Sequence, residues 1–429
     1  MIDVLESKSL DYKTLHNGIA DKLLERFLRY AQIFTTSNEA AASDKTPSTD
    51  CQWDLIRLLE KELKALGIKD VHVDEHGFLI ARIPGNLPAS KQVKTIGFMA
   101  HVDTNEDAPG ENVRPIVHNA YDGGIIRLAN NVVLDPAEFP LLRKYTGETI
   151  ITTDGNTLLG ADDKAGIAAI VSAADWLLSH PDIPHGEIEI IFTPDEETGM
   201  GMNRFPIESL KSSCCVTVDG GEEGVLECEC YYASKADITF AGKVIHPGTA
   251  RGKLINAATM AGEYIALLPR NESPEATDGR YGCYWPHKVS GGLERTELIV
   301  LLRSFDRKDM DRRKKALRKF GRAVEAAFPG GGVDIQFTDQ YFNMKEEIDK
   351  HPRLMDCLRK AYRLAEIDPI ERPIRGGTDG SRLTAMGIPT PNVFTGGQNF
   401  HGRYEWVALP AITRSAAVLL NFAAIWPEL

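Results

Sequence analysis

Two histidines and a set of carboxylates, far apart in the sequence, all follow predicted strands or open a predicted helix. They are His101 and Asp103 after segment 95–100, Asp162 and Asp163 at the head of a helix, Asp195, Glu196 and Glu197 after segment 187–193, Asp219 at the end of segment 214–219, and His401 in a glycine-rich loop after segment 390–394. Sites in open α/β sheets assemble at the carboxyl ends of strands. Carboxylates gathered there would repel one another unless cations neutralised them. Mixed imidazole and carboxylate donors are typical of zinc, and they also suit cobalt or manganese.

Taken singly, each of these residues has a simpler explanation. An Asp after a strand is usually a turn former or a helix cap, and a lone His is usually a hydrogen-bonded polar residue. The segment TPDEETG would by itself indicate a solvated acidic turn. The joint pattern of five sequence-distant groups favours a metal site over these interpretations.

The elements that must position these residues follow from hydrophobic periodicity. They are amphipathic helices at about 21–33, 52–66 and 352–366, a long apolar helix opened by residues 160–164, a hairpin of 71–73 and 78–83, and buried strands at 95–100, 187–193 and 214–219. The residues before this first helix predict a loosely held leader, and the polar stretch 35–50 predicts a loop.

After about residue 231 the pattern changes to strand–helix–strand–strand–helix–strand, and the α/β pattern resumes near 350. This order within about 110 residues is typical of a compact, ferredoxin-like α+β domain. We therefore predict a discontinuous α/β domain over 1–230 and 346–429, with a mixed sheet flanked by helices, interrupted by an α+β insert over 231–345.

Composition restricts the class of protein. The chain has 429 residues, 49 Lys and Arg against 61 Asp and Glu, a net charge of −12, and 43% hydrophobic residues, which together exclude wholesale disorder. The acidic balance argues against nucleic acid as a partner. The sequence predicts neither a membrane span nor a secretory signal. Seven cysteines, an odd number in a long chain, favour reduced thiols in the cytoplasm.

Several motifs together resemble one known family. They are GFMAHVDT, ITTDGNTLLGADDKAGIA, IPHGEIEIIFTPDEETGMG, TVDGG, HPGTARGKLINA, LLRSFDRK, PIRGGTDGSRL and PNVFTGGQNFHGRYEWV. In this order they resemble the peptidase T family, the tripeptide aminopeptidase branch of the di-zinc peptidases related to carboxypeptidase G and the aminoacylases. The resemblance runs from about residue 21 to the C-terminus. It implies the fold of the zinc peptidases and a lid domain formed by the insert.

The resemblance also implies residue roles. Two Zn²⁺ ions per chain are expected, with Co²⁺ or Mn²⁺ as accepted substitutes. The implied ligands are His101 and Asp219 for one ion, Glu197 and His401 for the other, and Asp162 bridging both. Asp103 would orient the His101 imidazole, and Glu196 would be the general base.

Four residues are expected to bind substrate. The resemblance implies that His246 of the lid stabilises the oxyanion, supported by Asn256. Arg303 and Arg375 are expected to hold the C-terminal carboxylate of the substrate, although an ordinary salt bridge is the alternative for each. A clamp at a fixed distance from the metals would select peptides by length, because an extended residue spans roughly 3.3–3.6 Å.

The expected function is a cytoplasmic metalloaminopeptidase that removes the N-terminal residue from tripeptides. The alternatives are a related di-zinc dipeptidase or an N-acyl amino-acid deacylase, in which only the substrate clamps would differ. A peptide-binding protein without catalysis would be free to lose ligands, and here all of them are present. The sequence leaves both a monomer and a homodimer open.

Overall fold

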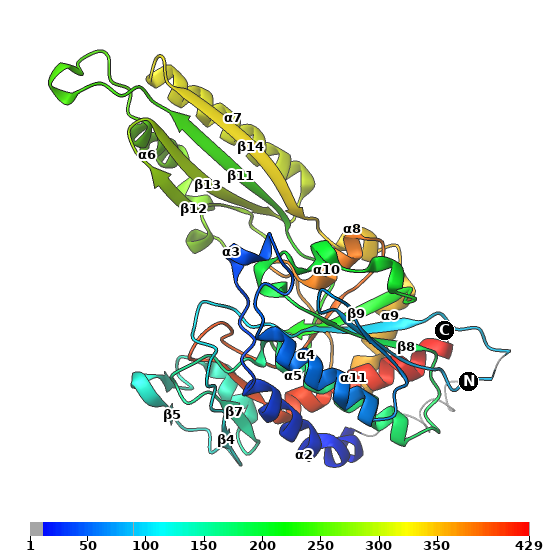
Figure 1. Cartoon of the computed structure of the whole chain (residues 1–429). Coiled ribbons are helices and arrows are strands. Elements are labelled where there is room, and N and C mark those ends of the chain that lie inside the picture. The colour runs from blue at the N-terminus through cyan, green and yellow to red at the C-terminus, as the bar shows by residue number, and fades with distance from the viewer. Residues whose placement is uncertain (1–11, 89, 429) are drawn as a thin grey trace. The chain divides into compact units, whose positions relative to one another are not determined.

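The computed structural model describes residues 12–88 and 90–428, which divide into two units (Figure 1). Unit 1 comprises Met1–Cys228, Glu346–Arg372 and Thr378–Leu429, and unit 2 comprises Glu229–Lys345 and Pro373–Gly377. The short segment that carries Arg375 thus belongs to unit 2. Within the described ranges, no helix is both long enough and apolar enough to cross a membrane.

Unit 1 is built on a mixed sheet of eight strands. They are β1 (Asp70–Val73), β2 (Leu79–Ile83), β3 (Ile96–His101), β8 (Ile188–Thr193), β9 (Cys214–Gly220), β10 (Val225–Glu227), β15 (Ile370–Glu371) and β16 (Asn392–Phe394). Their order is β1-β2-β8-β3-β9-β16-β10-β15. The central strands β8, β3, β9 and β16 run parallel, whereas β2 pairs antiparallel with both of its neighbours. The predicted mixed sheet is confirmed.

Helices cover both faces of this sheet, which explains why its central strands β3, β8, β9 and β16 are almost entirely buried. Phe98 and Met99 are neighbours in β3 and therefore point to opposite faces. The Phe98 ring lies 6.3 Å from that of Phe422, while Met99 packs in one cluster with Leu383. Phe422 belongs to α11 (Leu409–Ile425), and Leu383 belongs to α10 (Asp379–Ala385). The helix α5 (Ala161–Ser179) packs against β3 and β9, and α4 (Gln52–Ala65) packs against β1 and β2. Two further helices lie against these: α2 (Tyr12–Ala31) packs on α5 and α11, and α9 (Pro352–Leu364) packs on α11.

The first of these helices begins earlier than the sequence predicts. α2 starts at Tyr12 rather than near residue 21, and residues 1–11 lie outside the described part of the chain. The Tyr12 hydroxyl donates to the Pro410 carbonyl oxygen at 3.2 Å, and Leu15 is fully buried. The predicted leader is therefore wrong for residues 12–20. The contact that holds Tyr12 is with Pro410 of α11, which lies 398 residues further along the chain. No pattern in the sequence near Tyr12 therefore predicts it.

α5 approaches β9 through Gly166, where a side chain does not fit. A Cβ on Gly166 would lie 1.9 Å from the Val218 carbonyl oxygen and 2.4 Å from Asp163 Oδ1. We expect Gly166→Ala to lower the melting temperature, because overpacking of this kind costs about 1–3 kcal/mol.

The matched control for this prediction is Gly262→Ala in α6 (Ala257–Leu267) of unit 2. A Cβ on Gly262 would meet nothing within 4 Å, and alanine is favoured over glycine inside a helix by about 0.5–1 kcal/mol. Thermal unfolding should therefore show a lower midpoint for the first variant only. An unchanged midpoint in Gly166→Ala would contradict the close approach of α5 to β9.

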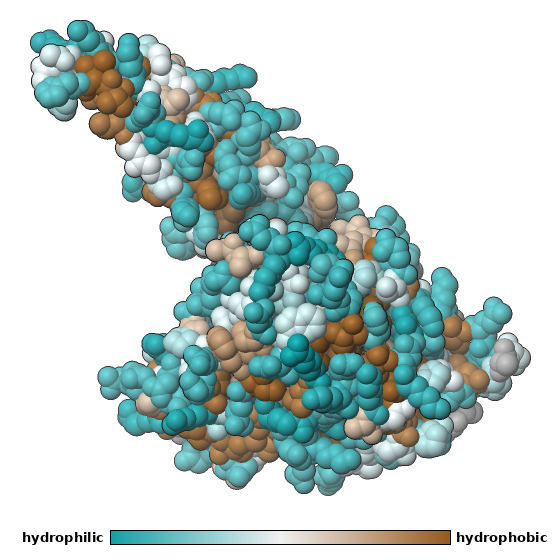
Figure 2. Space-filling view, viewed as in Figure 1, coloured by the Kyte–Doolittle hydropathy of each residue, from teal (hydrophilic) through white to brown (hydrophobic). Residues whose placement is uncertain are grey.

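Unit 2 is a single antiparallel sheet with two helices. Its elements follow the order β11 (Tyr232–Ala241), α6, β12 (Cys283–Gly291), β13 (Arg295–Ser304), α7 (Arg307–Ala327) and β14 (Gly332–Tyr341). The strands are arranged β12-β13-β11-β14, which is the predicted ferredoxin-like α+β arrangement. Phe240, Tyr264 and Leu317 pack in its core, between the sheet and the helices. Figure 2 shows that hydrophilic residues cover most of the visible face of each unit.

Candidate metal centre

The parallel strands of unit 1 bring most of the predicted site residues to one edge of the sheet. His101 ends β3, Asp219 lies near the end of β9, and Glu196 and Glu197 form the turn that follows β8. Because β8, β3 and β9 are parallel neighbours, these strand ends meet at the same edge. His401 reaches them from the loop that connects β16 to the short strand β17 (Trp406–Ala408).

Asp162 lies between the two histidines. Its Oδ1 is 2.8 Å from His101 Nε2, and its Oδ2 is 3.2 Å from His401 Nε2. Within residues 12–88 and 90–428, potential ligand atoms form two overlapping groups, each within 4.8 Å: His101, Asp163 and Asp219 in one, and His101, Asp162 and Glu197 in the other. The arrangement has the donor types and the proximity that a pair of cations requires.

The surroundings of His101 fit a metal ligand. Its ring is 2% exposed, and Nδ1 lies 3.1 Å from the carbonyl oxygen of Asp103. A proton on Nδ1 can be donated to that carbonyl, as metal-binding histidines commonly do through their second nitrogen. Nε2 then presents a lone pair towards Asp162 at 2.8 Å and Asp219 at 3.5 Å. Three acceptors that face one another in this way fit a cation between them.

One oxygen of Glu197 has a partner only when His401 is protonated. Its Oε1 is buried and lies 3.0 Å from His401 Nε2, which forms an ion pair with it only in the protonated state. The other oxygen accepts a hydrogen bond from Asn105 Nδ2 at 3.1 Å. A buried acceptor without a donor is costly unless a cation satisfies it. The residues present therefore fit a metal ion.

The pKa values show how concentrated the negative charge is. Burial, together with the charges of Asp162 and Glu197, raises the pKa of Asp219 to about 7 against the opposing contact with His101. Burial lowers the pKa of His401, but its contacts with Asp162 and Glu197 outweigh burial and raise that pKa to about 11. A bound cation would relieve the same repulsion by replacing protons.

Asp103 contacts both His101 and the turn that carries the two glutamates. Its Oδ1 lies 3.4 Å from His101 Nδ1. The same carboxylate accepts the backbone N–H of Glu196 at 3.0 Å and that of Glu197 at 3.2 Å. One fully buried side chain therefore fixes the turn that carries both glutamates.

Glu405 supports the centre, although no motif in the sequence indicates this role. This residue is 1% exposed, and its carboxylate accepts the backbone N–H groups of Leu159 at 2.6 Å, Gly160 at 2.9 Å and Asp162 at 3.2 Å. It thus holds the loop that places Asp162. The only signal in the sequence is a charged residue within the otherwise apolar segment YEWVALP.

Asp163 and Asp379 also lie close to the centre, and neither was assigned a role. Asp163 accepts the backbone N–H groups of His101 at 3.3 Å and Gly166 at 3.2 Å. Asp379 accepts a hydrogen bond from Thr193 Oγ1 at 2.6 Å, and burial raises its pKa to about 6. Both carboxylates therefore secure the backbone or the side chains that surround the ligands.

The four predicted substrate-binding residues all lie in unit 2. His246 is exposed, and its Nδ1 accepts the backbone N–H of Gly248 at 3.1 Å. Asn256 caps α6 through the N–H groups of Ala258 and Thr259. Arg303 donates from Nη1 to the Leu302 carbonyl oxygen and to Gln340 Oε1, both at 3.0 Å. Arg375 donates to the carbonyl oxygens of Thr277, Gly279 and Tyr281 and to the Thr277 hydroxyl.

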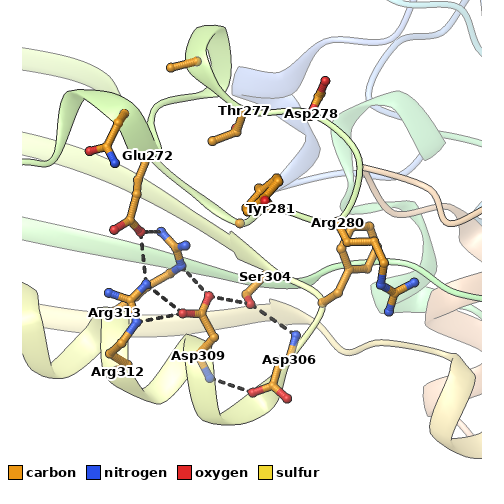
Figure 3. Close-up of a pocket in the computed structure, with 14 residues that line it drawn as sticks. Glu272, Thr277, Asp278, Arg280, Tyr281, Ser304, Asp306, Asp309, Arg312 and Arg313 are labelled. Atoms are coloured by element: carbon orange, nitrogen blue, oxygen red, sulfur yellow. Dashed lines mark hydrogen bonds and ion pairs between the residues drawn. The ribbon is translucent and has the colours of Figure 1, made fainter.

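The loop held by Arg375 forms one wall of a pocket of about 670 Å³ in unit 2 (Figure 3). The opposite wall carries Arg312 and Arg313 with Asp309 and Glu272, which pair with one another at 2.7–3.0 Å. The charges of this wall therefore neutralise one another. Nothing in the pocket resembles the unbalanced carboxylate cluster of unit 1.

Comparisons with known proteins identify the family. The model of peptidase family M20/M25/M40 matches residues 149–424. A peptidase T of Bacillus licheniformis is 45% identical over 410 residues, 95% of this chain and 99% of its own. A peptidase T of Geobacillus thermodenitrificans is 44% identical over 409 residues, 95% and 98% of the two chains.

Solved structures share the fold. A tripeptidase from Staphylococcus aureus is similar with a TM-score of 0.76 at 22% identity, over 96% of this chain and 99% of its own. The aminopeptidase PepT from Bacillus cereus is similar with a TM-score of 0.73 at 22% identity, over 95% and 98% of the two chains. The chain therefore belongs to peptidase family M20/M25/M40. Its predicted resemblance to peptidase T is confirmed, and so is the predicted class of enzyme, a metalloaminopeptidase.

Proposed function

We propose that this chain cleaves the N-terminal residue from tripeptides with two metal ions bound at the edge of the unit 1 sheet. The observation that carries the proposal is the Asp162 carboxylate, whose two oxygens face His101 at 2.8 Å and His401 at 3.2 Å. The proposed ligands are His101 and Asp219 for one ion, Glu197 and His401 for the other, and Asp162 for both. Zinc suits these donors, and cobalt or manganese can replace it.

Bound ions of this kind supply Lewis-acid chemistry, which polarises a carbonyl group and lowers the pKa of water. In this proposal Glu196 binds neither ion, so its carboxylate is available to move protons. Burial raises the pKa of Glu196 well above its usual range, and the charge of Asp219 adds to this shift. We assign Glu196 to take the proton of the attacking water and to return it to the leaving amine.

The substrate-binding groups are proposed to come from unit 2, which holds the insert and the segment Pro373–Gly377. Residues 1–230 and 346–429, apart from that segment, would form the catalytic domain, and residues 231–345 would form the lid. His246, supported by Asn256, would donate to the developing oxyanion. Arg303 and Arg375 would hold the C-terminal carboxylate of the peptide, for which the planar guanidinium group is well suited. The name of the curated relatives, peptidase T, supports a peptide substrate.

The compartment is part of the proposal. None of the seven cysteines forms a disulfide, and five of them are buried. Thiols in such number without a disulfide are typical of a reducing compartment, because oxidising compartments favour disulfides. We therefore place the enzyme in the cytoplasm.

A matched series of dipeptide, tripeptide and tetrapeptide, each with and without an N-acetyl cap, tests the substrate. We expect the uncapped tripeptide to be cleaved fastest, because a carboxylate clamp misplaces the scissile bond of other lengths by roughly 3.3–3.6 Å per residue. A chelator should abolish the activity, and added Zn²⁺ should restore it. Release of the N-terminal amino acid is measured by chromatography.

Three outcomes would contradict parts of the proposal. Faster hydrolysis of the capped substrates would assign the chain to the deacylases. Equal cleavage of the three peptide lengths would contradict the proposed carboxylate clamp, but it would not contradict the metal centre. Activity that persists after the chelator has removed all bound metal would contradict the metal centre itself.

A further inference from the structure

The segment that precedes α4 is fixed to the turn of the two glutamates. Ser48 donates to Asp195 twice, from its backbone N–H to Oδ2 at 2.7 Å and from its hydroxyl to Oδ1 at 2.5 Å. Gln52 Nε2 also donates to Asp195 Oδ1 at 2.7 Å, and Gln52 Oε1 accepts the Asp195 backbone N–H at 3.2 Å. All three residues are buried. Residues 48–52 therefore satisfy the carboxylate and the backbone N–H of Asp195 together.

Asp195 adopts a backbone conformation that needs such support. Its φ of 61° and ψ of 27° lie in the left-handed region, which non-glycine residues enter only when the surrounding structure holds them there. The next two residues are Glu196 and Glu197, the proposed proton carrier and a proposed metal ligand. The dihedral angles of Asp195 consequently set the direction in which both glutamates leave β8.

The same segment also contacts the turn after β3. Thr36 forms a β-bridge with Thr104. The backbone hydrogen bonds of this bridge run from the Ser37 N–H to the Thr104 carbonyl oxygen at 3.1 Å and from the Thr104 N–H to the Thr35 carbonyl oxygen at 3.2 Å. Thr104 follows Asp103, whose carboxylate holds the N–H groups of both glutamates. Residues 35–52 therefore brace the glutamate turn directly, through Asp195, and indirectly, through Asp103.

We propose that Ser48 and Gln52 are positioning residues for hydrolysis, which act through Asp195 to orient Glu196 and Glu197. The inference rests on the proposed function only in that Glu196 moves the proton. Residues 35–50, predicted from sequence to be a loop, thereby become part of the support of the active site. Removing the Ser48 hydroxyl or the Gln52 amide should misalign the glutamates while leaving the rest of the metal centre in place.

The chain contains a matched control for a purely structural effect. Ser212 donates to the buried carboxylate of Glu189 from its N–H at 2.8 Å and from its hydroxyl at 2.5 Å, almost the geometry of Ser48 on Asp195. Glu189 lies at the start of β8 and Asp195 just beyond its end. Ser212→Ala therefore removes the same kind of hydrogen bond at the other end of the same strand.

The test compares Ser48→Ala, Gln52→Ala, Ser48→Thr and Ser212→Ala with the wild type. The readouts are kcat, KM, melting temperature and bound metal per chain. We expect Ser48→Ala and Gln52→Ala to lower kcat about 10- to 100-fold with KM nearly unchanged, as small displacements of catalytic groups do. Ser48→Thr keeps the hydroxyl and should retain most of the wild-type kcat. Ser212→Ala should lose comparable thermal stability and keep kcat.

The proposal is overturned if Ser48→Ala and Gln52→Ala lose melting temperature as Ser212→Ala does but keep the wild-type kcat and bound metal. Should Ser48→Ala not fold, Gln52→Ala and Ser48→Thr still decide the question. The comparison uses whichever peptide or capped amino acid the wild type hydrolyses. If the proposed substrate is wrong, the wild type itself fails to hydrolyse the tripeptide. The comparison between the variants and the wild type can still be made with the substrate that the wild type does hydrolyse.

Discussion

Replacing Glu196 with glutamine should lower kcat by about 10²–10⁴-fold, which is the usual contribution of a general base. Glutamine has nearly the same shape but cannot accept the proton of the attacking water. The backbone N–H of residue 196 would still donate to Asp103, so the turn should keep its conformation. Steady-state kinetics on the tripeptide, with bound metal measured in parallel, check the prediction.

Bound metal decides between two roles for Glu196. As a proton carrier that binds no ion, Glu196 can be replaced without loss of metal, so kcat should fall while the metal content stays at the wild-type level. Glu208→Gln, on an exposed side chain, is the control and should change neither quantity. A Glu196→Gln variant that loses metal would make Glu196 a ligand, and one that keeps the wild-type kcat would remove it from catalysis.

Asp162→Asn should empty both metal positions and abolish hydrolysis. An asparagine presents one carbonyl oxygen and one NH₂ group, so it can no longer offer a charged oxygen to His101 and to His401 at the same time. Loss of partners that only support metal ligands already weakens binding about 10–100-fold. Loss of the shared ligand should therefore weaken metal binding by at least about 100-fold. Elemental analysis of the dialysed variant measures the metal that stays bound per chain.

The adjacent aspartate provides the comparison. The two oxygens of Asp163 accept the backbone N–H groups of His101 and Gly166, and an asparagine can still accept one of them. We expect Asp163→Asn to lose stability but to retain metal. The reverse result, in which Asp163→Asn loses metal and Asp162→Asn keeps it, would transfer the bridging role to Asp163.

The sequence predicts where the strands that carry this site end. The apolar run that forms a strand and the polar residue that follows it are both local features of the sequence. The run IGFMA, residues 96–100, has no polar side chain, and His101 follows it at once. Parallel neighbours in the sheet then bring these ends together, since right-handed connections leave few other arrangements. His401 was predicted in the same way, from a glycine-rich loop after a strand.

The supporting residues could not be predicted, because their partners are distant in the sequence. Glu405 binds backbone groups 243–246 residues away, and Gln52 binds Asp195 143 residues away. Neither contact alters local periodicity or composition. The start of α2 was misjudged for the same reason, since Tyr12 is anchored by residues near the C-terminus. Motifs therefore give the chemistry of the site, whereas its support depends on the three-dimensional fold.

The late position of His401 and Glu405 in the chain has a consequence for biosynthesis. Proteins are made from the N-terminus, and their early parts can fold first. His101, Asp162 and Asp219 are synthesised well before His401, and the Asp162 backbone gains its Glu405 anchor only after 243 further residues. With the proposed ligands, the centre is completed only once residue 401 has been made, so we expect prematurely terminated chains that end before it to be inert as hydrolases.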